Sequence, residues 1–259
     1  MSVIKEVENF YLSFNGKKGI IGKSLFNKPI YYIAVKKTKR PVIIAQYAIH
    51  AREYITSYLS LKQIEEFMRF GTCGTVYFIP MLNPDGVKIA LTKNPLYKAN
   101  GRGVDLNVNF DANWAKGAKN CFTKGAENFV GKHPFSEPES RAIRDFTLKI
   151  KPDMTVSYHS KGEEIYYQFF QNKRAEKRDY NLAKEISRVT GYKIKDTPFS
   201  CGGYKDWCIQ KLKIPAVTIE VGDDNLVHPL KKECVKEIFD KNRQVLAVLT
   251  NRLWEILCN

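Results

Sequence analysis

Hydrophobic and polar residues follow two different periods along this chain, and the two periods alternate. Short apolar runs rich in β-branched residues predict strands at 30–35, 42–47, 75–79, 154–158, 165–170 and 216–219. Longer stretches with apolar residues at helical spacing predict helices at 7–14, 54–70, 136–150, 175–189 and 226–257. Only the short basic segment 36–40 separates the first two strands, so we expect a hairpin turn there.

Strands that alternate with helices predict an α/β fold, in which helices flank a mixed central β-sheet. The chain has 259 residues, of which 44% are hydrophobic, and this is enough to bury one full core. No linker, internal repeat or low-complexity segment interrupts the pattern. We therefore expect residues 1–259 to form a single domain.

Three segments between the periodic runs have turn, loop or capping chemistry. Asn83-Pro84-Asp85-Gly86 combines the fixed φ of proline with a permissive glycine, so it predicts a turn. From 91 to 132 the periodicity fades, which is typical of a functional loop when the stretch is this long. Order returns at Ser136-Glu137-Pro138-Glu139, which predicts a capping box at the start of a helix.

The charge and cysteine content narrow the classes of partner. A net charge of +15 and a pI near 9.4 favour anionic partners. Zinc-finger spacing, an RNP-like motif and a long basic tract are all missing, which argues against nucleic acid and leaves bacterial cell wall or an acidic small substrate. No apolar run is long enough for a membrane span, so we expect no membrane partner. Six scattered cysteines and no recognisable signal peptide predict free thiols and a cytoplasmic protein, with release by cell lysis as the alternative.

Metal-ligating side chains stand at the carboxyl ends of three predicted strands. His50 follows the strand at 42–47 with Glu53 one turn later, and His159 follows the strand at 154–158. Glu220 follows the strand at 216–219. In open α/β sheets, ligands bind in the crevice outside these strand ends. Two imidazoles and one carboxylate fill three tetrahedral positions around Zn²⁺ and leave the fourth to water, so this pattern predicts a hydrolytic site with one zinc ion per chain.

Two further carboxylates have supporting roles in this interpretation. Glu220, outside the ligand set, would accept the proton of the attacking water and return it to the leaving amine. Asp105 is a candidate acceptor that fixes the tautomer of one zinc-bound histidine. Simpler interpretations stay open at this stage, because His159 could be a hydrogen-bonded histidine at a strand end and Glu220 a salt-bridged surface residue.

Several short motifs occur in the order found in zinc carboxypeptidases. They are His50-Ala51-Arg52-Glu53, Asn83-Pro84-Asp85-Gly86, Val104-Asp105-Leu106-Asn107, Phe135-Ser136-Glu137-Pro138-Glu139, Tyr158-His159-Ser160 and Thr218-Ile219-Glu220. From about Tyr32 to Gly222 the chain resembles that metallocarboxypeptidase family. The resemblance implies the family's phosphorylase/hydrolase-like fold, His50, Glu53 and His159 as zinc ligands, and Glu220 as general base. It also implies an arginine that stabilises the oxyanion, for which Arg102 is the nearest candidate.

The chain departs from family members that remove ordinary C-terminal residues. Those members bind the terminal carboxylate with adjacent Asn and Arg, whereas Asn107 is followed here by Val108, which cannot form a carboxylate clamp. The tyrosine expected four residues before the Gly-Gly pair is missing, and Pro198 and Phe199 stand near that place.

The run from Gly202 to Trp207 places Lys205 where the pocket for the leaving residue is expected to carry its specificity determinant. A lysine there suits a leaving residue with an extra carboxylate, while a solvated loop lysine is the alternative. The run resembles the branch of γ-D-glutamyl-diamino acid peptidases, which cut peptidoglycan peptides between the γ-carboxyl of D-glutamate and meso-diaminopimelate. By this resemblance the substrate-binding residues are Arg52, Asn107, Gly203, Tyr204 and Lys205.

Three functions follow from these observations. The favoured one is a zinc peptidase that cuts the γ-D-glutamyl–diaminopimelate bond of stem peptides or muropeptides. A second is an ordinary carboxypeptidase or an amino-acid deacylase of the same fold; Val108 counts against the former and Lys205 with its neighbours against the latter. A third is an inactive cell-wall-binding module, against which the complete set of ligands and Glu220 argues. Terminal or internal cleavage and the oligomeric state both stay open.

Overall fold

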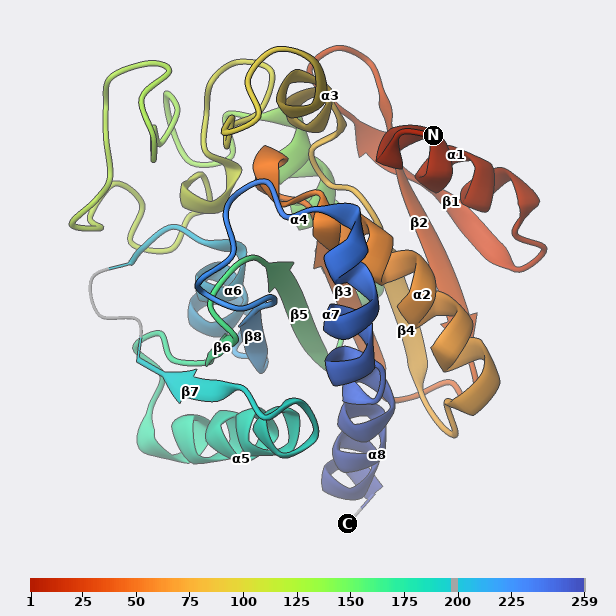
Figure 1. Ribbon diagram of the computed structural model, residues 1–259. Helices are drawn as coiled ribbons and strands as arrows, with labels where there is room; N and C mark the ends of the chain where they lie inside the picture. The colour runs from red at the N-terminus through yellow and green to blue at the C-terminus, as the bar shows by residue number, and fades with distance from the viewer. Residues whose placement is uncertain (197–199, 259) are drawn as a thin grey trace.

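A mixed sheet of eight strands forms the centre of the computed structural model, which describes residues 1–196 and 200–258 (Figure 1). The strand order is β1-β2-β4-β3-β5-β8-β6-β7. The strands are β1 (Lys17–Lys23), β2 (Pro29–Lys36), β3 (Val42–Tyr47), β4 (Thr75–Ile79), β5 (Met154–His159), β6 (Glu164–Tyr166), β7 (Lys193–Lys195) and β8 (Ala216–Glu220). The predicted mixed sheet is therefore confirmed.

The four central strands, β4, β3, β5 and β8, run parallel, so their carboxyl ends meet at one edge of the sheet. Antiparallel strands flank them, with β2 beside β4 and β6 beside β8. In this register Tyr47 pairs with Tyr158, and His159 pairs with Glu220. The side chains that end β3, β5 and β8 consequently lie side by side.

Helices cover both faces of the sheet. They are α1 (Val3–Ser13), α2 (Ile55–Phe70), α3 (Pro84–Thr92), α4 (Pro138–Ile150), α5 (Lys173–Thr190), α6 (Tyr204–Trp207), α7 (Val235–Asn242) and α8 (Val245–Cys258). Short turns of 3₁₀-helix or π-helix are η1 (Ala51–Glu53), η2 (Leu106–Val108), η3 (Cys208–Leu212) and η4 (Lys232–Cys234). Side chains of α2, α5, α7 and α8 enter the core on one face, and those of α4 and α6 enter the core on the other. In Figure 1, α2, α7 and α8 stand in front of the sheet.

Alternate side chains of the central strands enter these two cores, as the two-residue period of a strand requires. In β3, Ile43 and Tyr47 belong to the core under α2, and Ile44 belongs to the opposite core. The rings of Tyr47 and Tyr158 stack with centroids 4.8 Å apart. Gln63 of α2 bonds both hydroxyls, at 2.7 and 2.9 Å. This buried network fixes the ends of β3 and β5 just before the residues that carry the chemistry.

The predicted hairpin at 36–40 is wrong, because β4 lies between β2 and β3 in the sheet. The connection crosses the start of β4, where the backbone N–H groups of Lys37 and Thr38 donate to the carbonyl of Gly74 at 2.8 and 3.1 Å. β3 is apolar except for Gln46 and is almost fully buried, and such a strand is stabilised by burial between parallel neighbours on both sides. Its composition therefore outweighs the short spacing to β2.

Three further predictions also differ from the structure. The predicted turn at Asn83 is the start of α3, where the Asn83 side chain accepts from the N–H of Gly86 at 3.0 Å and Pro84 occupies the first turn. The N-cap of α4 is Glu137, whose side chain makes no capping hydrogen bond, so the predicted capping box is wrong. The C-terminal segment forms two helices, α7 and α8, instead of one.

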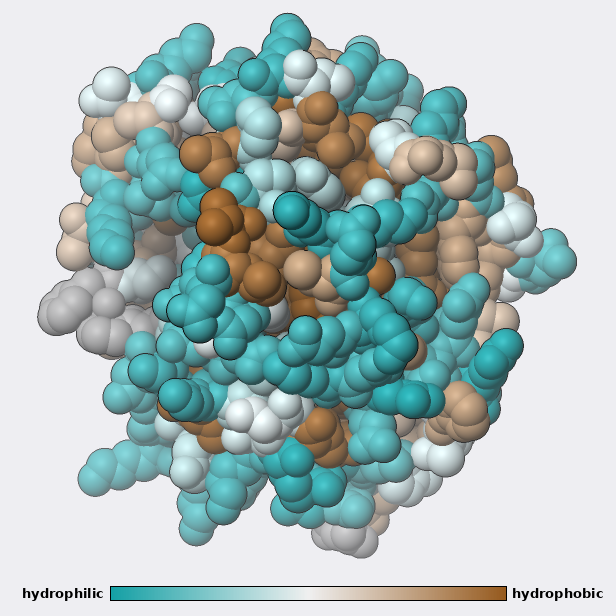
Figure 2. All heavy atoms as spheres, viewed as in Figure 1, coloured by the Kyte–Doolittle hydropathy of each residue, from teal (hydrophilic) through white to brown (hydrophobic). Residues whose placement is uncertain are grey.

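Hydrophilic side chains cover most of the face in Figure 2, with smaller apolar areas between them. In the part of the chain that the structure describes, no helix is both long and apolar enough to cross a bilayer. The six cysteines are free. Positions 198 and 199, near which the family tyrosine was expected, lie outside the described residues.

Candidate active site

Four side chains converge at the edge where the central strands end. His50 stands three residues beyond β3, and the one-turn helix η1 that follows it brings Glu53 back toward the same point. His159 and Glu220 are the last residues of β5 and β8 and lie opposite one another in the sheet. The structure thus brings together three distant segments of the chain, as the strand-end pattern predicts.

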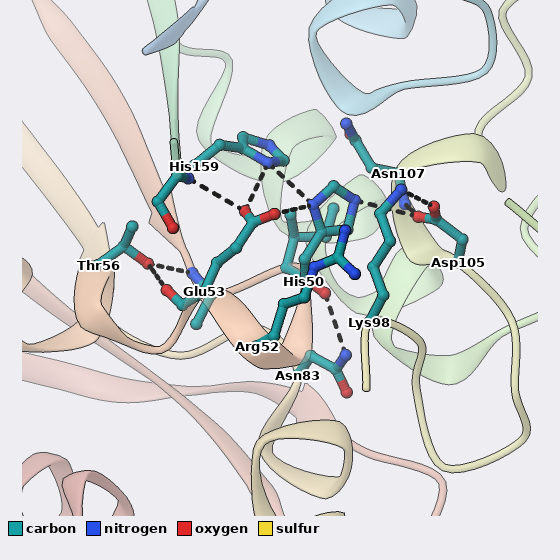
Figure 3. A network of polar contacts seen from close by, with 12 residues as sticks. His50, Arg52, Glu53, Thr56, Asn83, Lys98, Asp105, Asn107 and His159 are labelled. Atoms are coloured by element: carbon teal, nitrogen blue, oxygen red, sulfur yellow. Dashed lines mark hydrogen bonds and ion pairs between the residues drawn. The ribbon is translucent and has the colours of Figure 1, made fainter. Parts of the chain in front are cut away.

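His50, Glu53 and His159 form a tight buried triad (Figure 3). Nδ1 of His50 lies 2.8 Å from Oε1 of Glu53, and Nδ1 of His159 lies 3.0 Å from Oε2. The two Nδ1 atoms are 3.1 Å apart. Two ring nitrogens therefore share one carboxylate and face each other, an arrangement that calls for a positive charge between them.

The triad fits a zinc ion by the chemistry and the spacing of its donor atoms. Imidazole nitrogen and carboxylate oxygen are zinc ligands, and ligands around a tetrahedral zinc lie about 3.3 Å apart when the bonds are near 2.05 Å. The observed separations of 2.8, 3.0 and 3.1 Å approach that value. Three protein ligands leave one position for water or substrate, which is the catalytic type of site.

Electrostatics favour a cation at the triad. Burial opposes ionisation of Glu53, but the charge of His50 and the hydrogen bond with His159 hold the pKa of its carboxyl well below the usual range. Burial also lowers the pKa of His50, yet the Glu53 and Asp105 carboxylates outweigh it and raise that pKa to about 9. The pKa of His159 is lowered, chiefly by burial, so this imidazole is readily neutral. Ionised Glu53 and neutral His159 are the forms that bind metal, and on His50 a metal ion would replace the proton.

Asp105 orients His50 from the side opposite the triad. Its Oδ1 lies 3.2 Å from Nε2 of His50 and accepts from the N–H of Asn107 at 2.9 Å. Its Oδ2 lies 2.7 Å from Nζ of Lys98. Burial opposes ionisation, but Lys98 and His50 hold the pKa of the Asp105 carboxyl well below its usual range. An ionised acceptor on Nε2 keeps the proton there and leaves Nδ1 free to bind a metal.

Glu220 stands beside the triad without joining it. Burial and the negative charge of Glu53 raise the pKa of its carboxyl well above the ordinary 4.5. A carboxylate whose pKa is raised toward the working pH is suited to accept and return a proton. This environment is the one that a general base requires, and the role assigned to Glu220 from the sequence stays a prediction.

Arg102 does not lie at the triad. Its Nε donates to Oε2 of Glu137 at 3.1 Å, at the start of α4, and 44% of its side chain is exposed. Lys98 pairs with Asp105, and Asp105 in turn contacts His50 of the triad. The Lys98 side chain is 16% exposed. Arg102 is held by Glu137 at the start of α4, and its expected role at the oxyanion stays a prediction.

Lys205 is buried, which excludes the alternative of a solvated loop lysine. Its Nζ donates to Oδ1 of Asp206 at 2.6 Å and to the carbonyl of Gln168 at 2.7 Å. The ammonium also lies 5.5 Å from the ring centroid of Phe169. A lysine ammonium has three N–H groups, so one donor remains after these two bonds.

Tyr204, expected in the substrate pocket, is instead part of the core. Its ring is fully buried against Phe110 and Trp207, and its hydroxyl bonds Oγ1 of Thr147 at 2.8 Å. The side chain therefore has no surface to offer a substrate, and the expected contact is wrong. The aromatic ring belongs to the apolar face of α6, which the short motif did not show.

The remaining substrate-binding candidates lie on segments around the triad. Oδ1 of Asn107 accepts from the N–H of Tyr204 at 3.2 Å, and a side chain at Gly203 would meet Asn107 Oδ1 at 3.3 Å. This close approach joins η2 to the start of α6. Arg52 donates to Oε1 of Glu127 at 2.7 Å across the long loop. Their substrate contacts stay predictions.

Two residues near the triad received no role from the sequence. Lys98 lies in the aperiodic loop, where spacing gives no information on which side chains turn inward. His228 lies close enough for the charges of Glu53 and His50 to act on it, and burial lowers its pKa. The only local signal at His228 is the following proline.

Comparison with known proteins gives consistent results. Residues 13–243 match the model of the zinc carboxypeptidase family. The γ-D-glutamyl-L-diamino acid endopeptidase 1 of Lysinibacillus sphaericus is 28% identical over 90% of this chain and 66% of its own length. This chain thus spans just under two thirds of that relative.

Solved structures show the same fold. Bovine thrombin-activatable fibrinolysis inhibitor, solved with tick carboxypeptidase inhibitor, superposes with a TM-score of 0.84 at 21% identity, covering 98% of this chain and 95% of its own. A murein-tripeptide amidase from Escherichia coli O157 superposes with a TM-score of 0.63 at 21% identity, covering 93% of both chains.

Proposed function

The chain belongs to the zinc carboxypeptidase family, and on that premise we propose that it hydrolyses the bond between the γ-carboxyl of D-glutamate and meso-diaminopimelate in peptidoglycan stem peptides. Zinc is the cofactor, with His50, Glu53 and His159 as the residues that would hold it. The observation that carries the substrate assignment is the buried, partly unsatisfied ammonium of Lys205.

The Lys205 cation is already paired with Asp206 at 2.6 Å, and its remaining N–H can add a charge-assisted hydrogen bond to an anionic ligand. The Asp206 carboxylate and the Gln168 carbonyl fix the direction of the Lys205 ammonium and leave one donor for substrate. Diaminopimelate carries a second carboxylate that ordinary apolar or basic leaving residues lack. Val108, in place of the arginine of an Asn-Arg clamp, argues in the same direction, because an ordinary terminal carboxylate loses its bidentate partner.

The name of the Lysinibacillus sphaericus relative supports the same substrate class. That protein is named for cleavage of γ-D-glutamyl-L-diamino acid bonds, and it aligns over most of this chain. The basic net charge of +15 also agrees with an anionic wall fragment as substrate.

The residues around the triad would divide the reaction among them. When bound, zinc would polarise the scissile carbonyl and make the attacking water more acidic. Glu220 takes one proton from the water as its oxygen bonds to the carbonyl carbon, and it then gives that proton to the leaving nitrogen as the C–N bond breaks. Asp105 keeps His50 in the tautomer that the metal requires.

A pair of substrates that differ by one carboxylate tests the Lys205 assignment. L-Ala-γ-D-Glu-meso-diaminopimelate and L-Ala-γ-D-Glu-L-lysine share every other group at the scissile bond. We expect the wild-type protein to prefer the diaminopimelate peptide in kcat/KM by about tenfold or more, since one charge-assisted hydrogen bond contributes roughly 1.5–3 kcal/mol. Lys205→Met should remove that preference. An unchanged preference in this variant would show that Lys205 does not bind the second carboxylate of diaminopimelate.

Glu220→Gln tests the chemical step separately. We expect it to bind zinc and peptide and to lose most turnover, because an amide cannot accept the proton. Normal turnover in this variant would rule out Glu220 as the base.

We also propose that the enzyme acts on precursors or recycled muropeptides in a reducing compartment. Six free cysteines support this, since an oxidising compartment favours paired ones. Product analysis of cells that lack the protein would test the proposal: uncut tripeptides should accumulate in the cytoplasmic pool, and an unchanged pool would contradict it.

A further inference from the structure

Lys98 is anchored to the short segment that carries two of the three metal ligands, His50 and Glu53. Its carbonyl accepts from the N–H of Ala51 at 2.9 Å, which ties it to η1 between His50 and Glu53. From there its side chain extends along the site, and in Figure 3 its amine lies beside Asp105 and Asn107. Nζ contacts Oδ2 of Asp105 at 2.7 Å and Oδ1 of Asn128 at 2.8 Å.

The charge of Lys98 acts on the whole site as well as on its ion-pair partner. It lowers the pKa of His50, of His159 and of Glu220, so it lies within electrostatic range of both strand ends. The side chain is 16% exposed, whereas Asp105 is 2% exposed. The ammonium therefore lies at the border between the buried acceptor and the open side of the site.

We propose that Lys98 is the catalytic cation that stabilises the oxygen of the scissile carbonyl as it becomes negative. This inference rests on the proposed peptidase function, and it replaces Arg102 with a residue that lies slightly earlier in the same loop. Before substrate binds, Lys98 is the counterion of Asp105. During the reaction its flexible four-carbon side chain turns the ammonium toward the developing charge, and a cation placed there contributes to the rate only where charge appears.

Asp105 tolerates the departure of Lys98 because it keeps other partners. Oδ1 retains the N–H of Asn107 and the N–H of His50, at 2.9 and 3.2 Å. Without the shared cation, the carboxylate accepts more strongly from His50. The movement would then strengthen the donor character of His50 at the moment when charge builds on the substrate.

The competing interpretation is that Lys98 serves only as the counterion that keeps Asp105 ionised. The two interpretations differ in which measurement changes. A counterion affects folding stability and zinc affinity, and it has no contact with the reacting oxygen. A catalytic cation affects kcat and the binding of a ligand that mimics the tetrahedral, negatively charged species.

The test uses Lys98→Met, with Lys98→Arg as the conservative variant and Lys132→Met as the control that removes an exposed lysine from the same loop. Zinc content and the unfolding temperature are checked for each protein. For each, kcat and KM are measured on a peptide that the wild type cuts. Calorimetry gives the Kd of a phosphinate analogue of that peptide and of the peptide product.

We expect Lys98→Met to lose about 10²–10³ in kcat, the usual cost of one oxyanion-stabilising group. KM and the product Kd should stay within about threefold, and the phosphinate Kd should weaken in parallel with kcat. Lys98→Arg should recover part of both losses, and Lys132→Met should match the wild type. If Lys98→Met fails to fold, Lys98→Gln, which keeps a hydrogen-bond donor but not the charge, gives the same comparison.

The proposal is overturned if zinc-loaded Lys98→Met keeps both kcat and the phosphinate Kd within about threefold of wild type. It is also overturned if Arg102→Met, and not Lys98→Met, shows the parallel loss. Failure of the wild type to cut wall peptides refutes the proposed substrate alone, because the Lys98 comparison then uses whichever family peptide the wild type does cut.

Discussion

Asp105→Asn is the substitution whose effect follows most directly from the geometry of the site. The change keeps the size of a side chain that is almost fully buried and removes only its charge. The carboxylate has three partners: Nε2 of His50 at 3.2 Å, the N–H of Asn107 at 2.9 Å and Nζ of Lys98 at 2.7 Å. The first two donate to Oδ1 and Lys98 forms an ion pair with Oδ2, so an amide that keeps its oxygen at Oδ1 turns its NH2 group toward the ammonium and loses the ion pair.

The expected magnitude is a 10- to 100-fold loss of zinc affinity, the usual cost of removing a carboxylate behind a metal-bound histidine. That range equals about 1.4–2.7 kcal/mol at 25 °C. Two effects act in the same direction. The amide makes His50 a weaker donor to the metal, and the charge of Lys98 is left uncompensated beside the site. Lys98→Met in the same chain should therefore restore part of the loss.

The assay is competition for zinc between the metal-free protein and a chromophoric chelator at fixed pH. Asp111→Asn is the matched control, since Asp111 lies in the same loop in an exposed pair with Lys211 at 3.0 Å. Urea unfolding of each variant checks that the proteins compared are folded. Equal zinc affinities for Asp105→Asn and wild type, or equal losses in both Asn variants, would refute the reasoning.

Three further predictions concern stability, pH and thiol reactivity. Asn109→Ala should lower the free energy of unfolding in urea by about 3–5 kcal/mol, because each buried group left without a partner costs about 1–3 kcal/mol. The buried Asn109 amide binds the carbonyls of Val130 and His133 and the hydroxyls of Ser136 and Ser140. A decrease under 1 kcal/mol would contradict this. In the pH profile of kcat/KM, the acidic limb should lie above pH 4.5. Glu220 accepts a proton only when it is ionised, and because its pKa is raised it becomes protonated at a higher pH as the solution is acidified. An acidic limb at or below pH 4.5 would count against Glu220. Burial raises the pKa of the Cys208 thiol to about 12, whereas Cys258 is exposed. Iodoacetamide should therefore label Cys258 first and Cys208 only after unfolding, which peptide mass spectrometry would show. Early labelling of Cys208 would disprove its burial.

The sequence predicts the metal site well because strand ends are visible in it. Interior parallel strands are mostly apolar runs, and the first histidine or acidic residue after such a run marks the edge of the sheet. His159 and Glu220 follow this rule directly, and His50 follows it within a short turn. Side chains that the sheet itself positions are thus predictable without knowledge of the strand order.

The strand order and the loop geometry are not visible in the same way. The hairpin expected between β2 and β3 fails because pairing is decided across the sheet, where β4 enters from later in the chain. β1 was missed because its residues are half-exposed and carry lysines and glycines, which obscure its alternation. The inward direction of Lys98 and of Tyr204 could not be predicted, for a related reason. The direction of a side chain in an irregular segment depends on contacts with distant residues, here Asp105 and Thr147.

The central claim is that the protein cuts the γ-D-glutamyl–diaminopimelate bond, and product analysis tests it most directly. The zinc-loaded protein is incubated with L-Ala-γ-D-Glu-meso-diaminopimelate and, separately, with a blocked peptide that ends in an ordinary L-residue. Mass spectrometry then identifies the products. We predict release of free diaminopimelate from the first peptide and no cleavage of the second. Cleavage of the second peptide alone would contradict the claim and would mean that this chain recognises an ordinary terminal carboxylate without the Asn-Arg clamp.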